Sequence, residues 1–81
     1  MNNLDRLKKE IPQMVRMHRK KSSLSQAALA QLAGVGKTVI FDLEHGKTTI
    51  QMDTLLRVFD ALNIEIRLFS PLLQAIKETQ E

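Results

Sequence analysis

Apolar residues recur at helical spacing along most of the chain, and small or polar residues separate the runs. In the first clear run, Ile11 and Met14 lie on one face of a helix. Because proline is tolerated only in the first turn of a helix, Pro12 predicts that this helix spans about residues 11–20 and that a shorter turn over residues 3–10 precedes it. The same spacing predicts three more helices, over about residues 26–33, 37–44 and 52–62.

Residues with capping and stop preferences mark the ends of these helices. Ser25 is a good N-cap for the second helix, and Gly34 ends it because glycine adopts the left-handed conformation at little cost. Gly46 stops the third helix. Gly36 has no side chain with which to cap the start of that helix, so we expect a weaker cap there.

After residue 63 the period changes from helical to alternating. The alternating positions are Ile64, Glu65, Ile66, Arg67 and Leu68. This pattern predicts a strand over residues 64–69. Antiparallel pairing of two copies about a two-fold axis through Ile66 brings Glu65 of one chain opposite Arg67 of the other, which is a favourable pairing. We therefore expect a homodimer formed through this strand.

The expected fold class is all-α, with a repressor-like domain of four to five helices over residues 1–63 and a dimerisation strand and C-terminal tail over residues 64–81. In the alternative to a dimer, the alternating segment is a short extended tail that lies on its own domain. Residues 72–81 are expected to form a last helical turn or a frayed end.

Length and composition restrict the class of protein. The 81 residues allow one small domain, which buries a limited part of its surface and benefits from a partner. The absence of cysteine excludes disulfides and thiolate metal sites. No run reaches the roughly 20 apolar residues that span a membrane, and the N-terminus lacks an apolar signal core. We therefore expect a cytoplasmic protein without a membrane partner or a cofactor.

Basic residues are concentrated in the first part of the chain. Residues 1–47 carry nine lysines and arginines against four acidic residues, whereas residues 48–81 carry three against five. A positive front half suits the phosphate backbone of nucleic acid, although runs of charge are more often only solvated faces.

No motif in the chain indicates catalysis. Residues 34–38 read Gly-Val-Gly-Lys-Thr, like the end of a phosphate-binding loop, but Gln31 stands where that loop requires its first glycine. No carboxylate pair or nucleophile with a neighbouring base stands out. We expect neither enzymatic activity nor a small-molecule substrate.

Nine positions in the middle of the chain follow a known pattern. They are Gln26, Leu29, Ala30, Gly34, Val35, Ile40, Leu43, Glu44 and Gly46. In this order and spacing they resemble the phage-repressor-like (Xre/Cro-type) helix-turn-helix family, over about residues 11–62. The resemblance implies a domain whose third helix enters the major groove of DNA while its second helix lies against the backbone.

The resemblance carries DNA-binding roles over to nine residues: Ser25, Gln26, Gly36, Lys37, Thr38, Phe41, Asp42, Lys47 and Thr48. Lys37 and Thr38 would face base edges, while Gln26 would contact a phosphate, as would Lys47 with Thr48 beside it. The alternatives are structural: Gln26 only reinforces its own helix cap, and Lys37 and Thr38 are ordinary surface residues.

Two of the nine residues, Asp42 and Phe41, have more than one possible role beside the major groove of DNA. Asp42 can accept a hydrogen bond from cytosine but repels phosphate, and it can instead hold Lys37 or Thr38 in place. Phe41 is expected to be exposed, against a thymine methyl group or a sugar, or tucked against a neighbouring protein.

Two further pairs of residues are interpreted as structural. The family resemblance implies an ion pair between Arg19 and Glu44 that ties the first helix to the end of the third. His18 is expected on a partly buried helix face, and His45 at a helix end, where positive charge is favourable. Neither histidine is expected to bind a metal.

A narrower resemblance begins at Asp53. The run from Asp53 to Ile66 is similar to HipB-type antitoxins, short proteins that end in a strand paired across a dimer. In that family the protein represses its own operon and neutralises a HipA-type serine/threonine kinase toxin. The resemblance implies double-stranded operator DNA and a HipA-type toxin as partners. The alternatives are a stand-alone regulator without a toxin and a protein-interaction adaptor, against which the basic front half argues.

Overall fold

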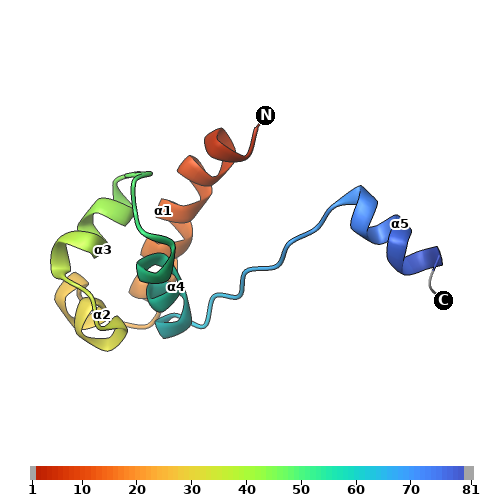
Figure 1. Cartoon of the computed structure of the whole chain (residues 1–81). Coiled ribbons are helices and arrows are strands. Elements are labelled where there is room, and N and C mark those ends of the chain that lie inside the picture. Colours follow the sequence, from red (N-terminus) through yellow and green to blue (C-terminus); the bar gives the residue numbers. More distant parts are fainter. Residues whose placement is uncertain (1, 80–81) are drawn as a thin grey trace.

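The computed structural model describes residues 2–79, and this part of the chain contains five helices (Figure 1). They are α1 (Asn3–Lys21), α2 (Gln26–Ala33), α3 (Lys37–Glu44), α4 (Met52–Ala61) and α5 (Pro71–Thr79). The first four pack together, and α5 stands apart from them at the end of an extended segment. The all-α fold class expected from the sequence is confirmed.

The first four helices enclose one small core. Val15, Leu29, Ile40 and Val58 come from α1, α2, α3 and α4 respectively, and each is 0% exposed. The other buried residues of the core are Ala30, Ala33, Leu43, Phe59, Leu62 and Ile64. Each helix therefore turns one apolar face inward, as the 3.6-residue period of its sequence requires.

α1 is one continuous helix of 19 residues with Pro12 inside it, so the predicted break at this proline was wrong. Proline removes the hydrogen bond that the carbonyl of Lys8 would otherwise accept. That carbonyl faces the turn after α3, where a Cβ atom added to Gly46 would lie 3.8 Å from its oxygen. The helix tolerates the loss because the Asp5 N–H donates to Asn2 Oδ1 at 2.8 Å, which caps its start, and because its apolar face continues past the proline.

A serine before α2 and two glycines between α2 and α3 set the ends of these helices. Ser25 Oγ accepts a hydrogen bond from the Ala28 N–H at 3.0 Å and caps the start of α2. Gly34 ends α2 in the left-handed conformation, at φ +73°. Gly36 begins α3 with extended backbone and no side-chain cap. These features agree with the capping pattern of the sequence.

The segment after α4 is extended but forms no strand within residues 2–79, so the predicted strand over residues 64–69 is corrected. A strand is defined by ladder hydrogen bonds to a neighbour, and the single chain offers this segment no such neighbour. Ile64, expected in the dimer strand, is buried in the core of its own chain, with 8% of its surface exposed. Its N–H donates to the Phe59 carbonyl at 2.8 Å, after a left-handed turn at Asn63.

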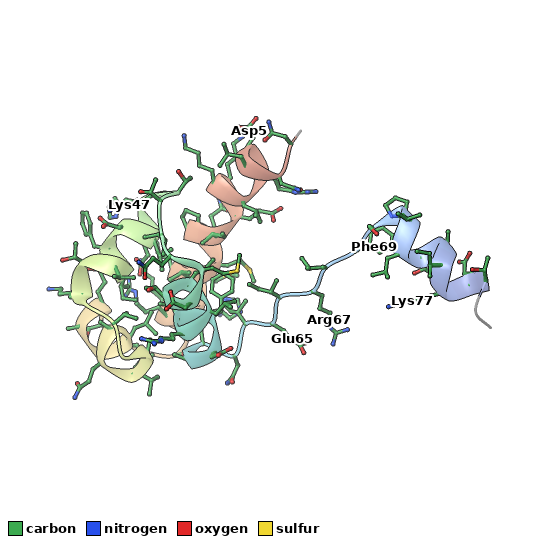
Figure 2. All side chains as sticks on the ribbon, in the orientation of Figure 1. Asp5, Lys47, Glu65, Arg67, Phe69 and Lys77 are labelled. Carbon is green, nitrogen blue, oxygen red and sulfur yellow. The ribbon has the colours of Figure 1, made fainter. Side chains whose placement is uncertain are left out.

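We call residues 3–64 the bundle and residues 65–79 the tail. The tail leaves the bundle instead of lying on it, which corrects the alternative interpretation of this segment (Figure 2). Leu68 and Phe69 are 89% and 78% exposed. The apolar side chains of the tail therefore lack the cover that the bundle gives to its own.

α5 is longer than the last helical turn predicted for residues 72–81. It spans nine residues, and Ser70 Oγ caps its start by accepting a hydrogen bond from the Leu73 N–H at 2.9 Å. Residues 80 and 81 lie outside the described part of the chain. None of the helices found in residues 2–79 combines the length and the apolar character needed to cross a membrane.

Candidate nucleic-acid interface

α3 has a buried side and an exposed side. Ile40 and Leu43 hold it against the core, with 0% and 2% of their surface exposed. Lys37 and Thr38, in its first turn, are exposed, and Phe41 one turn later is 49% exposed. Residues three or four apart on a helix are neighbours, so these three side chains share the outward side. The core thus fixes the helix while its first turn faces solvent.

The polar side chains of that first turn have no protein partner within residues 2–79. The side-chain hydrogen bonds and ion pairs of α3 there involve Asp42, Glu44 and His45, and they leave Lys37 and Thr38 unpaired. A lysine ammonium and a threonine hydroxyl at such a place are available to donate hydrogen bonds to another molecule.

Asp42 is paired with Lys47, in the loop after α3. Lys47 Nζ lies 3.4 Å from Asp42 Oδ2, and the Lys47 backbone N–H donates to the Asp42 carbonyl at 3.0 Å. The expectation that Asp42 holds Lys37 or Thr38 is therefore corrected, because the turn at Gly46 brings Lys47 back to the carboxylate first. The pair keeps a lysine side chain next to the end of α3, and it offsets the negative charge of Asp42.

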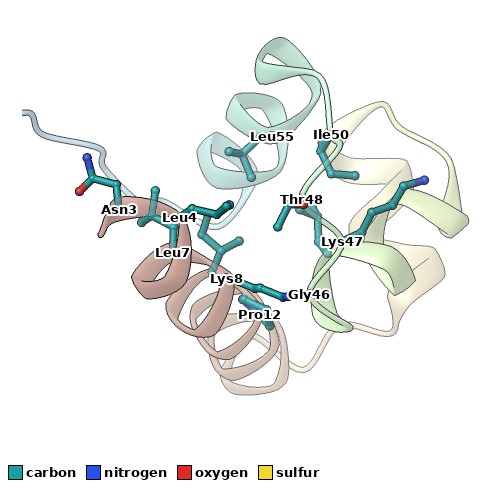
Figure 3. A pocket seen from close by; sticks show the side chains of 12 residues that line it. Asn3, Leu4, Leu7, Lys8, Pro12, Gly46, Lys47, Thr48, Ile50 and Leu55 are labelled. Carbon is teal, nitrogen blue, oxygen red and sulfur yellow. The ribbon is translucent and has the colours of Figure 1, made fainter. Parts of the chain in front are cut away.

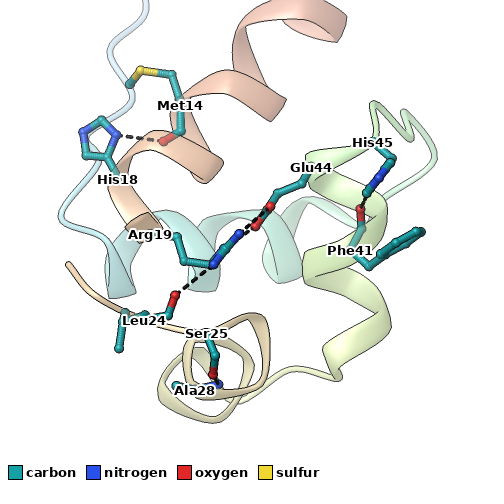
Figure 4. Close-up of polar contacts among 9 residues, drawn as sticks. All are labelled: Met14, His18, Arg19, Leu24, Ser25, Ala28, Phe41, Glu44 and His45. Carbon is teal, nitrogen blue, oxygen red and sulfur yellow. Dashed lines mark hydrogen bonds and ion pairs between the residues drawn. The ribbon is translucent and has the colours of Figure 1, made fainter. Parts of the chain in front are cut away.

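Phe41 stacks on His45, the residue that caps the C-terminal end of α3. Their ring centroids are 4.0 Å apart with an interplanar angle of 22°, and His45 Nδ1 donates to the Phe41 carbonyl at 2.7 Å (Figure 4). His18 makes the equivalent bond to the Met14 carbonyl, at 2.8 Å. Each histidine is thus tied to the backbone of its own helix. The exposed ring of Phe41 is supported from behind by His45.

An ion pair between Arg19 and Glu44 joins α1 to the end of α3 (Figure 4). Arg19 Nε and Nη2 donate to the two oxygens of Glu44 at 2.6 and 2.9 Å, in a bidentate arrangement. Arg19 Nη1 also donates to the Leu24 carbonyl at 2.9 Å, just before α2. The side chains of the pair are only 12% and 4% exposed. One guanidinium therefore fixes the relative positions of α1, α3 and the start of α2.

The environment of Glu44 favours its charged form. Burial alone would raise the pKa of the carboxyl, but the hydrogen bonds and charge of Arg19 outweigh it, and the pKa lies below its ordinary value. The Gln26 side chain and the charge of Arg16 add smaller contributions in the same direction. The pKa of Arg19 is raised in turn by its hydrogen bond to Glu44, against the effect of burial. Both groups therefore stay ionised at neutral pH.

The nine residues expected at a DNA interface come from three neighbouring places. They lie at the start of α2, on the outward side of α3 and in the loop after α3, and seven of the nine are exposed. Gln26 and Asp42 are the two that are half-buried. Gln26 also contributes to the environment of Glu44, so its side chain is close to the ion pair as well as to the start of α2.

Sequence reasoning missed two features of this region. The pairing of Asp42 with Lys47 had a signal in the sequence, since Gly46 predicts a turn between them. Leu4 and Leu7 continue the apolar spacing of α1, but Pro12 led to their assignment to a separate turn.

The architecture agrees with known proteins. The family model described as Helix-turn-helix matches residues 15–69, which is more than half of the chain. The chain belongs to the helix-turn-helix family. It is similar to the uncharacterized HTH-type transcriptional regulator y4mF of Sinorhizobium fredii (strain NBRC 101917 / NGR234), with 42% identity over 62 residues, 76% of this chain and 82% of that protein. This helix-turn-helix protein is a transcriptional regulator with a DNA-binding domain.

Proposed function

We propose that this helix-turn-helix protein binds palindromic operator DNA as a homodimer and represses its own operon. The observation that carries the proposal is the combination found in α3, a helix fixed on one side by Ile40 and Leu43. On its other side Lys37 and Thr38 are exposed and have no side-chain partner among residues 2–79. Two such helices in a dimer would read half-sites about one helical turn, or 34 Å, apart.

The proposed contacts divide into those that read bases and those that hold the backbone. Lys37 can donate to guanine O6 and N7, and Thr38 can contact a base edge or a thymine methyl group. Phe41, held by its stack on His45, can contact a thymine methyl group or a sugar. At Gly36 the absence of a side chain leaves open space beside the backbone, where DNA can approach closely.

The remaining residues are proposed to position the protein on phosphates. Ser25 and Gln26 lie at the start of α2, where N–H groups and the helix dipole favour an anion. Lys47 and Thr48 are exposed beyond the end of α3. Because Asp42 is paired with Lys47, its charge would be partly offset near the phosphates, and its free lone pairs can accept from cytosine.

The proposed dimer forms through residues 64–68, paired antiparallel about a two-fold axis at Ile66. In this register Leu68 of one chain lies opposite Ile64 of the other, on the same face of the ladder. Since Ile64 is buried at the edge of its own core, Leu68, 89% exposed in the single chain, would cover the core edge of the second copy. Within one chain Arg67 Nη2 lies 3.1 Å from Glu65 Oε2. In the proposed dimer Glu65 of one chain would instead pair with Arg67 of the other, across the ladder.

We also propose that the protein is the antitoxin of a HipA-type kinase toxin, as its resemblance to HipB-type antitoxins implies. The stand-alone regulator remains the competing proposal, and the name of the similar protein, an HTH-type transcriptional regulator, favours it. The antitoxin proposal would be supported if the protein co-purified with a kinase produced from the neighbouring gene and restored the growth of cells that produce this kinase. Toxicity that is unaffected by the protein would contradict it.

The DNA-binding proposal is tested by fluorescence anisotropy with the DNA upstream of the gene and a scrambled control, at two salt concentrations. Lys37→Ala is expected to weaken operator binding about tenfold and scrambled DNA little, because a base contact is worth about 1–3 kcal/mol. Lys47→Ala is expected to weaken both DNAs alike and to reduce the salt dependence.

The matched control is Lys77→Ala, which removes the same charge from α5. It is expected to leave the affinity nearly unchanged, since α5 contributes none of the residues proposed to contact DNA and lies away from α3 within one chain (Figure 1). Equal losses on both DNAs for Lys37→Ala and Lys47→Ala would contradict the division of roles. Equal and weak binding of the unaltered protein to both DNAs would contradict the operator.

A further inference from the structure

An apolar groove lies on the bundle, and the loop after α3 with Lys47 and Thr48 forms part of its lining (Figure 3). The first half of α1, the loop after α3 and the start of α4 form its walls. Its apolar lining consists of Leu4, Leu7, Ile11, Pro12, Leu43, Ile50 and Leu55. Leu4 and Leu7 are 60% and 46% exposed, although their positions continue the core-facing stripe of α1. The groove thus presents apolar surface that α1 to α4 leave uncovered.

α5 carries a matching apolar face. Leu72, Leu73 and Ile76 are spaced to share one side of the helix and are 72%, 41% and 43% exposed. An isolated helix of nine residues is only marginally stable in water, and stability comes mainly from packing of its apolar face. Within its own chain α5 stands away from the bundle (Figure 1). Its apolar face is therefore left uncovered by its own chain.

We propose that α5 of a second copy of this chain binds in the groove, so that the two chains of the dimer exchange their last helices. The inference rests on the proposed dimer through residues 64–68. An amphipathic helix that lays its apolar face into a groove is a recurrent mode of protein recognition.

The register of the proposed strand pair brings α5 to the second copy. With the two-fold axis at Ile66, Leu68 lies opposite Ile64, the extended residue that directly follows the left-handed turn at Asn63 of the second copy. Ser70, two residues further on, would then come near Leu62 at the end of that copy's α4. Leu55, in the groove, precedes Leu62 by seven residues, or about 10 Å along α4. α5 is about 13 Å long, so it is long enough to reach the groove from that point.

The same register directs α5 away from the groove of its own chain. The segment from Ile64 to Ser70 is extended and spans about 20 Å, in the direction that leaves the bundle (Figure 1). The opposite charges of Glu65 and Arg67 favour the antiparallel register on which the arrangement depends.

Single-cysteine chains provide the test, because the natural sequence has no cysteine. A Leu7→Cys chain and a longer, tagged Leu73→Cys chain are mixed under reducing conditions, allowed to exchange and then oxidised. We expect a disulfide between the two different chains as the main product. Leu4→Cys, at a more exposed position, serves as a second groove variant. Gln74→Cys, on the polar side of α5, is the matched control and is expected to cross-link at least tenfold less.

Three results would overturn the proposal. A disulfide within the double variant Leu7→Cys/Leu73→Cys, without one between mixed chains, would show that α5 folds back onto its own bundle. Cross-linking of Gln74→Cys as efficient as that of Leu73→Cys would show that no particular face of α5 binds. The absence of cross-links from both groove variants would show that α5 does not occupy the groove.

The mass and operator affinity of the unaltered protein, measured in the same buffer, separate this inference from the proposed function. A dimer that binds the operator but gives no groove cross-link would overturn the helix exchange alone. A monomer that fails to bind the operator would overturn the proposed function and, with it, the exchange.

Discussion

The bundle and the tail both carry regularly spaced apolar residues, at helical spacing in the bundle and in alternation in the tail, but these side chains are mostly buried or half-buried in the bundle and exposed in the tail. Each helix of the bundle has neighbours against which to turn its apolar face, and Ile40 is fully buried. In the tail, Ile66, Leu68 and Phe69 are 48%, 89% and 78% exposed. The bundle is therefore stabilised by contacts within one chain, whereas the apolar surface of the tail is suited to contact with another chain.

Truncation of an apolar side chain in each region should separate these two roles most strongly. Ile40→Ala is expected to lower the free energy of unfolding by about 3 kcal/mol, because it leaves a cavity in the core. Leu68→Ala is expected to leave the unfolding of dilute, monomeric protein unchanged and to raise the dimer dissociation constant about tenfold. Urea unfolding followed by circular dichroism and analytical ultracentrifugation measure the two effects.

Ile66→Ala, at the two-fold axis of the proposed strand pair, extends this test. It is expected to weaken dimerisation at least as much as Leu68→Ala. An unfolding free energy that falls equally for the variants at positions 40 and 68, at concentrations where the protein is monomeric, would contradict the comparison.

One ion pair from each region, Arg19–Glu44 in the bundle and Glu65–Arg67 in the tail, sharpens the same contrast. Glu44→Ala is expected to cost about 3 kcal/mol, because Arg19 would remain nearly buried at 12% exposure without its partner. Glu65→Ala removes the partner of Arg67, whose side chain is 84% exposed, and is expected to leave the bundle's stability unchanged. Thermal unfolding of both variants beside the natural protein compares them directly.

Arg19→Lys serves as the control for geometry at the buried pair. A lysine keeps the charge but loses the bidentate contact, so a smaller loss of stability than for Glu44→Ala is expected. A loss at Glu65 as large as that at Glu44 would show that burial does not distinguish the two pairs.

Much of the bundle could be predicted from the sequence because its signals are local. Ser25 caps α2 through its hydroxyl, and Gly34, which lacks a Cβ atom, adopts the left-handed conformation, as these residue types predict. The spacing of Ile40 and Leu43 predicts which side of α3 is buried. Each of these features depends on a few neighbouring residues and on helical periodicity, which a sequence displays directly.

The features that were mispredicted depend on contacts distant in the sequence. Pro12 looks like a helix start, but the capped turn before it and the packing of α1 keep the helix continuous. Alternation after Asn63 predicts a strand, yet a strand exists only with a neighbour. The burial of Ile64 follows from the turn at Asn63, which returns the chain to its own core. Asp42 pairs with Lys47 across the turn after α3, a contact that the helical spacing of the sequence does not predict.

Acid should weaken the bundle through Glu44. Its pKa is below the ordinary value of 4.5, so the unfolded chain takes up this proton more readily than the folded one. The stabilisation is therefore complete above the unfolded pKa and is lost as the pH falls through the lower, folded pKa. The free energy of unfolding, followed between about pH 6 and pH 3, is expected to fall more steeply for the natural protein than for Glu44→Gln. Parallel curves of unfolding free energy against pH for the natural protein and Glu44→Gln would contradict this prediction. Glu65→Gln in the tail is the control, and its curve should follow that of the natural protein.

The smallest expected effect concerns helix caps, which the two regions use differently. Ser70 caps α5 in the tail, whereas α3 in the bundle begins at Gly36 without a side-chain cap. A Cβ atom at Gly36 would meet nothing within 4 Å, so Gly36→Ser should add a cap without strain and raise the free energy of unfolding by about 0.5 kcal/mol. Gly36→Ala separates the hydroxyl from the backbone effect and is expected to gain less. Ser70→Ala should reduce the helical signal of α5 and leave the unfolding of the bundle unchanged at concentrations where the protein is monomeric, because α5 stands apart from the bundle of its own chain. A drop in bundle stability in that variant would mean that the tail supports the bundle within one chain.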